Sequence, residues 1–234
     1  MGNSRAKIGL FEEGILRDVL VLPNDAPIDE GQLIRMMTGA HVIASSVNDR
    51  EALLQIVADN ASSYYYLTHL TPIPIKTLYK TPETLGKDRL AGVLGAWSKY
   101  KGQATLVVDI GTCMTYDLID ESGVHRGGNI APGIDLRYRI MHTGTANLPR
   151  VKMRLNNEIM GTDTPSALQN GGLYGIICEI EGVAHRIAKE FSNFGLVLTG
   201  GDARLIGKEL SVPCDVHPNL VLEGLYEILK YNEH

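Results

Sequence analysis

Cysteine is scarce in this sequence. Among its 234 residues only Cys113, Cys178 and Cys214 are cysteines, and they lie far apart, without a second Cys or His at metal-binding spacing. An odd number of scattered cysteines predicts neither a disulfide framework nor a zinc site. The composition is therefore typical of a protein from a reducing cytoplasm.

Basic runs and long apolar segments are also missing from the sequence. Its formal net charge is −5 and its pI is about 5.8. Without clustered Lys and Arg, neither a nucleic acid nor an anionic membrane is expected as a partner. No segment has the pattern of a signal peptide, and no apolar run approaches the roughly 18 residues of a membrane-spanning helix. We therefore expect a soluble, cytoplasmic protein.

Glycine, in contrast, is abundant. Its 25 residues include the pairs Gly127-Gly128, Gly171-Gly172 and Gly200-Gly201, and the total exceeds the usual share of roughly 7%. Paired glycines let backbone amides come close to a ligand or to another strand. Several such approaches are therefore expected along the chain.

Short apolar runs rich in β-branched residues alternate with segments of helical periodicity, which is the pattern of an α/β protein. A domain boundary at Gly102 gives an N-terminal lobe of residues 1–102 and a C-terminal lobe of residues 103–234. The expected strands lie at 8–11, 19–22, 41–47, 64–66, 105–109, 113–120 and 195–198, and the expected helices lie at 30–37, 48–59, 88–100, 134–143, 164–191 and 220–229.

The stretch from Tyr79 to Arg89 carries the most specific chemistry. A flexible approach with Pro82 and Gly86 delivers Asp88 and Arg89 to the first turn of an apolar helix. A base beside a fixed cation can hold and deprotonate a small anionic substrate that carries a hydroxyl. An Asp near a helix start is also commonly a cap or a partner of the helix dipole, so both interpretations stand at this point.

A second motif opens the C-terminal half, where a strand ends in Asp109-Ile110-Gly111-Thr112. A glycine turn there can present backbone amides and the Thr112 hydroxyl to phosphate while the carboxylate meets a cation. Gly2-Asn3-Ser4, which precedes Ala6-Lys7-Ile8, has the same layout of glycine turn, small polar residue and strand. This repetition predicts a duplicated fold with one phosphate turn from each half.

Three further segments contain turn residues. Arg126 to Gly133 is expected to be a loop, either a ligand-binding one or a plain hairpin turn, and Arg137 and Arg139 in the following helix are expected to be solvated. The sequence from Thr199 to Ala203 is a third glycine turn at a strand end, although it lacks the Walker and Gly-x-Gly-x-x-Gly signatures. For the longest helix we predict Thr164 as N-cap and Pro165 as first residue, at a helix start that could also bind a carboxylate.

Together these segments resemble the type III pantothenate kinases, in the superfamily of acetate and sugar kinases, heat-shock ATPases and actin. The most specific match to the family pattern Tyr-x-x-Pro…Leu-Gly-x-Asp-Arg is formed by Tyr79 to Pro82 and Leu85 to Arg89. Order and spacing are added by Asp109 to Thr112, Gly161-x-x-Thr164, Gln169-x-Gly171 and Thr199 to Gly201.

The resemblance implies a duplicated ribonuclease-H-like α/β fold, the two-lobed fold of actin-like ATPases. It also implies ATP-dependent phosphorylation of pantothenate to 4′-phosphopantothenate, the first step toward coenzyme A, in a homodimer. Asp88 would be the general base, and Asp109 would bind the required potassium or ammonium ion. The pantothenate site would contain Tyr79, Gly86, Lys87, Asp88, Arg89 and the partner subunit's Thr164. The ATP phosphates, with their Mg²⁺, would meet Gly2, Asn3, Ser4, Arg5, Ala6, Lys7 and Thr112.

One departure from the family pattern concerns the beginning of the chain. The family opens with a strand that ends in Asp-x-Gly-Asn-Thr/Ser, and Met1 occupies the x, so the Asp would fall just before it. We expect either that the start codon is assigned too late or that an edge strand and a carboxylate are lost. The alternatives to a pantothenate kinase are a non-catalytic regulatory or accessory protein of the same fold and a kinase for another small hydroxy acid or sugar.

Overall fold

The structure, a computed structural model, describes residues 5–23, 29–46 and 51–233. By their internal contacts the residues form two compact units. Unit 1 comprises residues 1–102, 122–127 and 219–234, and unit 2 comprises residues 103–121 and 128–218. Gly102 is thus one of the points at which the chain passes between units, whereas the last helix, which the sequence assigned to the C-terminal lobe, belongs to unit 1.

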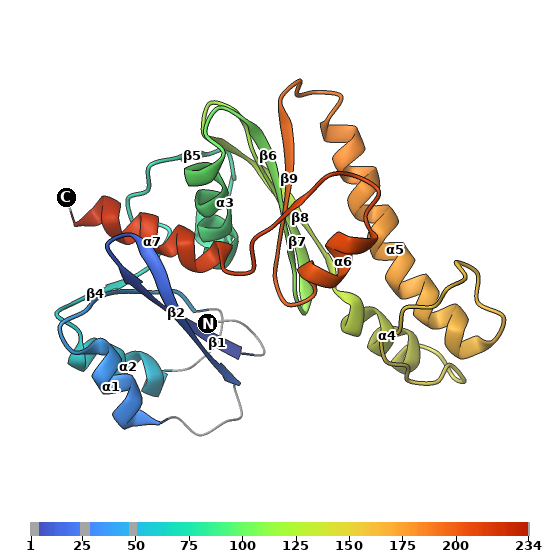
Figure 1. Cartoon of the computed structure of the whole chain (residues 1–234), viewed down its shortest axis with the longest axis horizontal. Coiled ribbons are helices and arrows are strands. Elements are labelled where there is room, and N and C mark those ends of the chain that lie inside the picture. The colour runs from blue at the N-terminus through green and yellow to red at the C-terminus, as the bar shows by residue number, and fades with distance from the viewer. Residues whose placement is uncertain (1–4, 24–28, 47–50, 234) are drawn as a thin grey trace. The chain divides into compact units, whose positions relative to one another are not determined.

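Unit 1 combines two strand pairs with four α-helices, among the residues that the structure describes. β1 and β2 form an antiparallel hairpin. Its turn contains Glu13, with φ of 51°, and Gly14, with φ of 83°, a positive pair that matches the twist of the two strands. The elements labelled in Figure 1 are β1 (Arg5–Glu12), β2 (Ile15–Pro23), α1 (Glu30–Met37), β3 (His41–Ala44), α2 (Glu51–Asn60), β4 (Ser63–Tyr66), β5 (Lys76–Thr77), a 3-10 turn (Pro82–Thr84), α3 (Lys87–Lys99) and α7 (Leu220–Asn232).

The N-terminal part of unit 1 has a small core of its own. β3 and β4, which precede and follow α2 in the chain, pair in parallel. α1 begins at an N-cap, Asp29, whose side chain accepts a hydrogen bond of 2.9 Å from the Gln32 amide. The core between these elements consists of Ala6, Leu33, Met37, Leu53 and Val57. The strands and helices expected in this region are present, with ends that differ by a few residues; the expected strand end at 47 and helix start at 48 lie outside the described residues.

Helix α3 is buried on more sides than its periodicity predicted. The sequence indicated one apolar stripe, but every residue from Arg89 to Ala96 is buried. The reason is α7, which packs against α3 in unit 1 at two glycines. A Cβ on Gly95 would lie 2.4 Å from the Leu220 carbonyl oxygen, and a Cβ on Gly224 would lie 1.7 Å from the Ala91 carbonyl oxygen. The backbones of the two helices therefore touch (Figure 1).

Unit 2 is built on a mixed sheet. β6 pairs antiparallel with β7 and parallel with β9, and β9 pairs parallel with β10. The strand order is β10-β9-β6-β7-β8, followed by β5 next to the first residues of β8. The further elements are β6 (Ala104–Ile110), β7 (Cys113–Ile119), β8 (Val124–Pro132), α4 (Ile134–Thr143), α5 (Thr164–Ile187), β9 (Phe194–Thr199), α6 (Ala203–Glu209) and β10 (Asp215–Val216).

This order is the ribonuclease-H-like arrangement that the resemblance predicts. Three consecutive strands lie side by side, and the next two extend the sheet beyond β6. The helix expected at 164–191 is present as α5 but ends at Ile187, and its apolar stripe joins the core on the sheet with Leu173, Ile176, Ile177 and Ile180. Within the described ranges, no helix combines the length and apolar character required to cross a bilayer.

Two expectations about unit 2 are wrong. Residues 126–132 were predicted to be a loop but belong to strand β8, because hydrogen bonding to a neighbouring strand outweighs the turn tendency of Gly and Pro. Arg137 was predicted to be solvated, yet its guanidinium pairs with the Glu179 carboxylate and donates a 2.8 Å hydrogen bond to the Pro132 carbonyl. Arg139 is exposed, as expected.

Candidate functional site

The first candidate site lies in unit 1, where α3 begins. Gly86 is the N-cap of α3 and offers no side chain to cap it. Two residues on, Asp88 turns one carboxylate oxygen back, and that oxygen accepts a 2.9 Å hydrogen bond from the Arg89 amide. A Cβ on Gly86 would lie only 2.6 Å from the same oxygen. The Gly-x-Asp spacing therefore exists because the carboxylate occupies the place of a side chain at the N-cap.

Part of the capping interpretation of Asp88 thus holds, because the carboxylate satisfies an amide of the first helical turn. The second carboxylate oxygen makes no hydrogen bond to any residue that the structure describes. Asp88 is partly exposed, so this oxygen can accept a proton or a hydrogen bond from a ligand. The cap and the base are compatible roles for one carboxylate.

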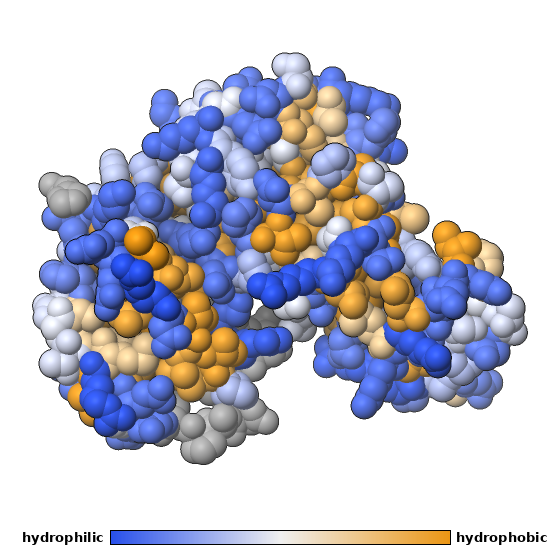
Figure 2. Space-filling model, viewed as in Figure 1, coloured by the Kyte–Doolittle hydropathy of each residue, from blue (hydrophilic) through white to orange (hydrophobic). Residues whose placement is uncertain are grey.

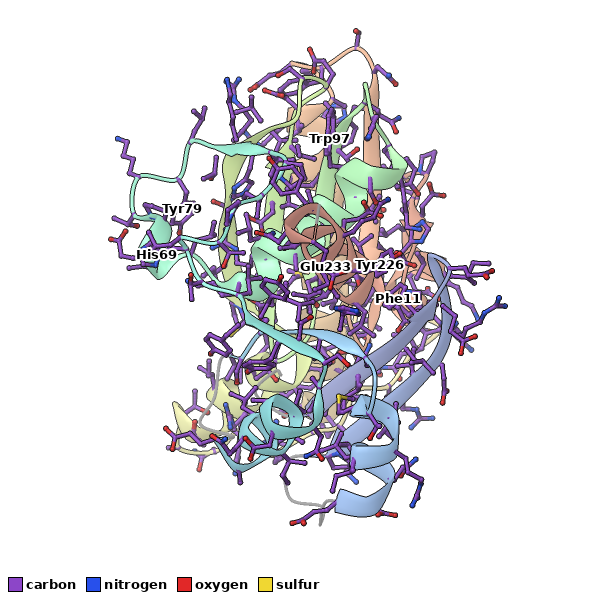
Figure 3. All side chains as sticks on the ribbon, turned by 90° about the vertical axis from the view of Figure 1, so that its left-hand side faces the viewer. Phe11, His69, Tyr79, Trp97, Tyr226 and Glu233 are labelled. Atoms are coloured by element: carbon purple, nitrogen blue, oxygen red, sulfur yellow. The ribbon has the colours of Figure 1, made fainter. Side chains whose placement is uncertain are left out.

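Arg89 is held differently. It is 7% exposed, and its guanidinium carbon lies 5.4 Å from the centre of the Tyr79 ring, within the range of a cation–π contact. Tyr79 comes from the loop before α3, as Figure 3 shows. Two residues that the sequence predicted to share a site are therefore in contact, although ten positions separate them.

Lys87, in contrast, turns away from these groups. Its ammonium donates to the Leu85 carbonyl at 2.9 Å and to the Glu83 carbonyl at 3.3 Å. The side chain thereby ties the 3-10 turn to the start of α3. Leu85, which follows that turn, is buried. The segment that leads into α3 is therefore held both by this buried side chain and by the hydrogen bonds of Lys87.

His125 is a neighbour of this site that sequence analysis missed. It lies on β8, is fully buried, and its ring is parallel to that of Tyr79, with 6.4 Å between ring centres. Its Nδ1 atom is 2.9 Å from the Thr77 hydroxyl. The pairing of β5 with β8 brings His125 opposite Thr77, and a pairing so distant in sequence leaves no local signal.

The second candidate site lies in unit 2, where β6 and β9 end. We call it the Asp109 turn cluster, and it consists of Asp109, Gly111, Thr112, Gly133 and Gly200. Asp109 and Thr199 are register partners on parallel strands, so both turns leave the same edge of the sheet. This is the edge at which open α/β sheets bind ligands.

Glycine is required at two positions of the Asp109 turn cluster. Gly200 has φ of 96°, and a Cβ there would lie 2.5 Å from an Asp109 carboxylate oxygen. A Cβ on Gly133 would lie 2.0 Å from the Gly111 carbonyl oxygen, and the Gly133 amide donates to the Thr112 carbonyl at 3.1 Å. The Thr112 side chain is exposed. The glycine turns expected at 111 and 199–203 thus come together, and Gly133 supports the first of them.

The cluster offers oxygen ligands and a hydroxyl. The Asp109 carboxylate, the backbone carbonyls around Gly111 and the Thr112 hydroxyl are hard ligands that suit an alkali cation or phosphate-bound magnesium. Among the described residues no group of three or more His, Cys, Asp or Glu side chains could hold a metal ion. The donor set therefore fits a cation whose other ligands are oxygen atoms of carbonyl groups, water or a nucleotide.

The predicted start of the longest helix needs a correction. The N-cap of α5 is Asp163, not Thr164, and Thr164 and Pro165 are its first two residues. Asp163 accepts a 2.8 Å hydrogen bond from the Ser166 amide and another from the Ser166 hydroxyl, which lower the pKa of Asp163. A carboxylate is preferred to a hydroxyl at this position because its negative charge is also stabilised by the positive end of the helix dipole.

Thr164 is exposed beside a pocket in unit 2. The pocket is lined by Met141, Leu148, Gly161, Thr162, Asp163, Thr164, Ala167 and Leu168. The loop that leads to it is fixed by Asn170, which is buried and donates to the Glu158 carbonyl at 2.8 Å. The Tyr138 hydroxyl donates to the Gln169 carbonyl at 2.8 Å. Thr164 is thus presented on a supported surface.

The remaining predicted ATP ligands stand at the beginning of unit 1. Gly2, Asn3 and Ser4 lie outside the described residues. On β1, the Arg5 side chain is exposed, Ala6 is buried in the core and Lys7 is half-buried. Ala6 could therefore meet a phosphate only through its backbone.

The unit 2 sheet, with a carboxylate and glycine turns at one edge, defines a protein of the actin-like ATPase fold. The family model of type III pantothenate kinases matches residues 1–186. A type III pantothenate kinase of Flavobacterium johnsoniae is 33% identical over 233 residues, which are 99% of this chain and 96% of that protein. The one from Phocaeicola vulgatus is 35% identical over 236 residues, with 100% and 97% coverage. The chain belongs to the type III pantothenate kinase family.

A solved structure agrees with the fold. A Campylobacter jejuni protein, described as a conserved Baf family transcriptional activator, superposes with a TM-score of 0.65 and 23% identity, over 99% of this chain and 96% of that one. At this identity the likeness concerns the fold alone.

Proposed function

We propose that this protein transfers the γ-phosphoryl group of ATP to the primary hydroxyl of pantothenate, which gives 4′-phosphopantothenate and ADP in the first step of coenzyme A synthesis. The observation that carries the proposal is the start of α3, where Asp88 and the buried Arg89 stand side by side in a chain of this family. A hydroxy acid needs both a base for its hydroxyl and a cation for its carboxylate.

In this reaction Asp88 accepts the hydroxyl proton as the pantothenate oxygen forms its bond to the γ-phosphorus. The bond from that phosphorus to the bridging oxygen breaks, and ADP leaves with the electron pair. Phosphoryl transfer requires positioning and charge neutralisation more than covalent chemistry. One positioned base and bound cations are therefore sufficient.

The acceptor site is assigned to the residues around α3. Arg89 would pair with the pantothenate carboxylate, and Tyr79 would hold that guanidinium in place by the cation–π contact of 5.4 Å. Gly86 and Lys87 would offer backbone groups, because the Lys87 ammonium is engaged with carbonyls. Thr164, at the exposed start of α5, would complete the site from the partner subunit of a homodimer.

The donor site is assigned to the Asp109 turn cluster and to residues 2–7. Thr112 would contact ATP phosphates through its exposed hydroxyl, together with Gly2, Asn3, Ser4, Arg5, Ala6 and Lys7. Asp109 would hold a potassium or ammonium ion, whose positive charge would offset that of the phosphates. Magnesium would arrive on the nucleotide.

A homodimer is supported by the surface of unit 2. Large apolar side chains are exposed there on β8, on α4 and in the loop before α5, namely Ile130, Ile140, Leu155, Ile159 and Met160. Apolar surface is visible among the hydrophilic residues in Figure 2. Met160 is 76% exposed, and exposed apolar side chains that gather on one surface favour association between chains. We place the protein in the cytoplasm, where ATP and pantothenate occur.

The test is an assay of ADP release with pantothenate, run in potassium and then in sodium. Turnover that needs both pantothenate and potassium supports the proposal. Turnover with another hydroxy acid or a sugar but not with pantothenate assigns a different kinase. Binding of pantothenate without ADP release in any salt favours the non-catalytic alternative.

A further inference from the structure

His125 is a buried titratable side chain to which the proposed reaction gives no role. It is 0% exposed and lies on β8, beyond the segment from Tyr79 to Arg89. Its imidazole is nearly parallel to the Tyr79 ring, since the two planes differ by 3°. A polar ring is rarely placed in a core without partners, so its contacts indicate what it does.

The Thr77 hydroxyl links His125 to the backbone of Tyr79. It accepts a 3.1 Å hydrogen bond from the Tyr79 amide and lies 2.9 Å from His125 Nδ1. A hydroxyl that accepts from the amide can donate its own hydrogen to Nδ1. The Leu78 amide also donates to the His125 carbonyl at 2.9 Å. Both backbone and side chain of His125 therefore fix β5 and the start of the loop that carries Tyr79.

From Tyr79 the contacts continue to Arg89. The guanidinium carbon lies 5.4 Å from the Tyr79 ring centre, whereas the imidazole centre lies 6.4 Å from it. Arg89 is buried, so the ring against which it lies determines where its charge can point. The three planar groups form a series from β8 through the loop to the first turn of α3.

We propose that His125 is a positioning residue for the acceptor site, which orients Tyr79 and through it the Arg89 guanidinium that receives the substrate carboxylate. The inference rests on the proposed function for the identity of the substrate. The ligand class is a small hydroxy acid, because the positioned cation matches a carboxylate and Asp88 stands next to it. Supporting side chains of this kind set the geometry of a binding group without touching the ligand.

Two variants separate the ring of His125 from its hydrogen bond. His125→Phe keeps a flat ring next to Tyr79 and loses the bond to Thr77. His125→Asn keeps a polar atom near the position of Nδ1 and loses the ring. His185→Asn, at an exposed site on α5, is the matched control. For each protein we would measure KM for pantothenate, KM for ATP and kcat.

We expect His125→Asn to raise KM for pantothenate about tenfold, a moderate effect for a misplaced binding group, with KM for ATP within about twofold of wild type. His125→Phe, which keeps the ring, should raise KM for pantothenate much less than His125→Asn does. In a double-mutant cycle with Tyr79→Leu, the His125→Asn change should add little, because both act on one contact. Equal changes in both KM values, additive effects in the cycle, or a lower melting temperature with an unchanged KM for pantothenate would each overturn the proposal.

A measurement without substrate keeps the two proposals apart. The Arg89 Hε resonance senses the ring current of Tyr79, so His125→Asn should shift it in the ligand-free protein, whereas His185→Asn should not. An unshifted resonance overturns the positioning role whatever the enzyme does. A shifted resonance in a wild-type protein that does not phosphorylate pantothenate supports the positioning of Arg89 and overturns the proposed function with the substrate assigned to it.

Discussion

Gly95 of α3 and Gly224 of α7 face each other without a side chain between them. A Cβ on Gly224 would lie 2.9 Å from the Gly95 amide nitrogen and 1.7 Å from the Ala91 carbonyl oxygen. Because α3 carries Asp88 and Arg89 in its first turn, the contact between the two helices supports the acceptor site from behind. The packing of α7 is thus part of what positions the proposed chemistry.

Gly224→Ala should lower the free energy of unfolding by about 3 kcal/mol, the upper range for overpacking a close contact. The added methyl group would overlap backbone atoms of α3, which cannot rotate aside as a side chain could. The two helices must therefore move apart. Denaturant unfolding monitored at Trp97 measures the effect. In Gly182→Ala the new Cβ has nothing within 4 Å, so this α5 variant should be neutral or slightly stabilised. Equal stability of the two variants would contradict the packing described here.

Asp88→Asn should lower turnover about 10²–10⁴-fold, which is the usual contribution of a positioned proton acceptor. The fold should not change, because the amide oxygen can still accept from the Arg89 amide. Asp18→Asn is a close control, since the Asp18 carboxylate accepts from the next amide at 2.8 Å in the same way but lies on β2. Near-normal turnover of Asp88→Asn would remove the base from the proposed mechanism.

Asp109→Ala should abolish the difference between potassium and sodium in the ADP-release assay. The carboxylate is the one anionic group of the Asp109 turn cluster, and without it the site has only neutral ligands for a cation. Glu121→Ala removes an exposed carboxylate on the turn after β7 and should leave the salt response unchanged. A potassium response that survives Asp109→Ala would place the cation elsewhere.

Stability should fall as pH rises above about 10, the usual pKa of tyrosine. Burial raises the pKa of Tyr138 to about 12, and burial together with the Glu179 charge also raises the pKa of Tyr116. Between the unfolded and folded values, the folded state keeps protons that the unfolded chain has lost, so each group contributes a slope of up to about −1.4 kcal/mol per pH unit.

Urea unfolding between pH 8 and about pH 11.5 measures this slope, in a range chosen around the ordinary tyrosine pKa. Tyr138→Phe should reduce it, whereas Tyr231→Phe, at a side chain that is 51% exposed, should not. A slope that is identical in the two variants would mean that Tyr138 titrates normally in the folded protein.

Local sequence patterns were sufficient for most elements but not for those that depend on distant partners. The helix from Ile134 to Thr143 and the strand that ends at Asp109 were predicted from periodicity alone. Residues 126–132 were misread because their glycines and proline indicate a turn, whereas the neighbouring strand that makes them part of a sheet is encoded elsewhere. Arg137 was misread for the same reason, since its partner Glu179 lies on another helix.

The candidate site shows the same division. Asp88, Arg89 and Tyr79 belong to one short motif, and the contact between Arg89 and Tyr79 agrees with their predicted association. His125 comes from a strand far along the chain, and a lone histidine next to a valine carries no signal of its burial. The α5 cap was missed by one residue because Asp163 and Thr164 are both good N-caps, and only the Ser166 contacts decide between them.

Helix α7 also sets an order of assembly during synthesis. Residues 103–218 contain every segment of unit 2, whereas the glycine contact of α3 stays uncovered until α7 has left the ribosome. We therefore expect a chain truncated after Pro218 and released from the ribosome to protect the β6–β9 sheet from proteases but not α3. The helix that bears the proposed base would then be among the last parts of the molecule to become rigid, so the acceptor site would form only once the whole chain is present.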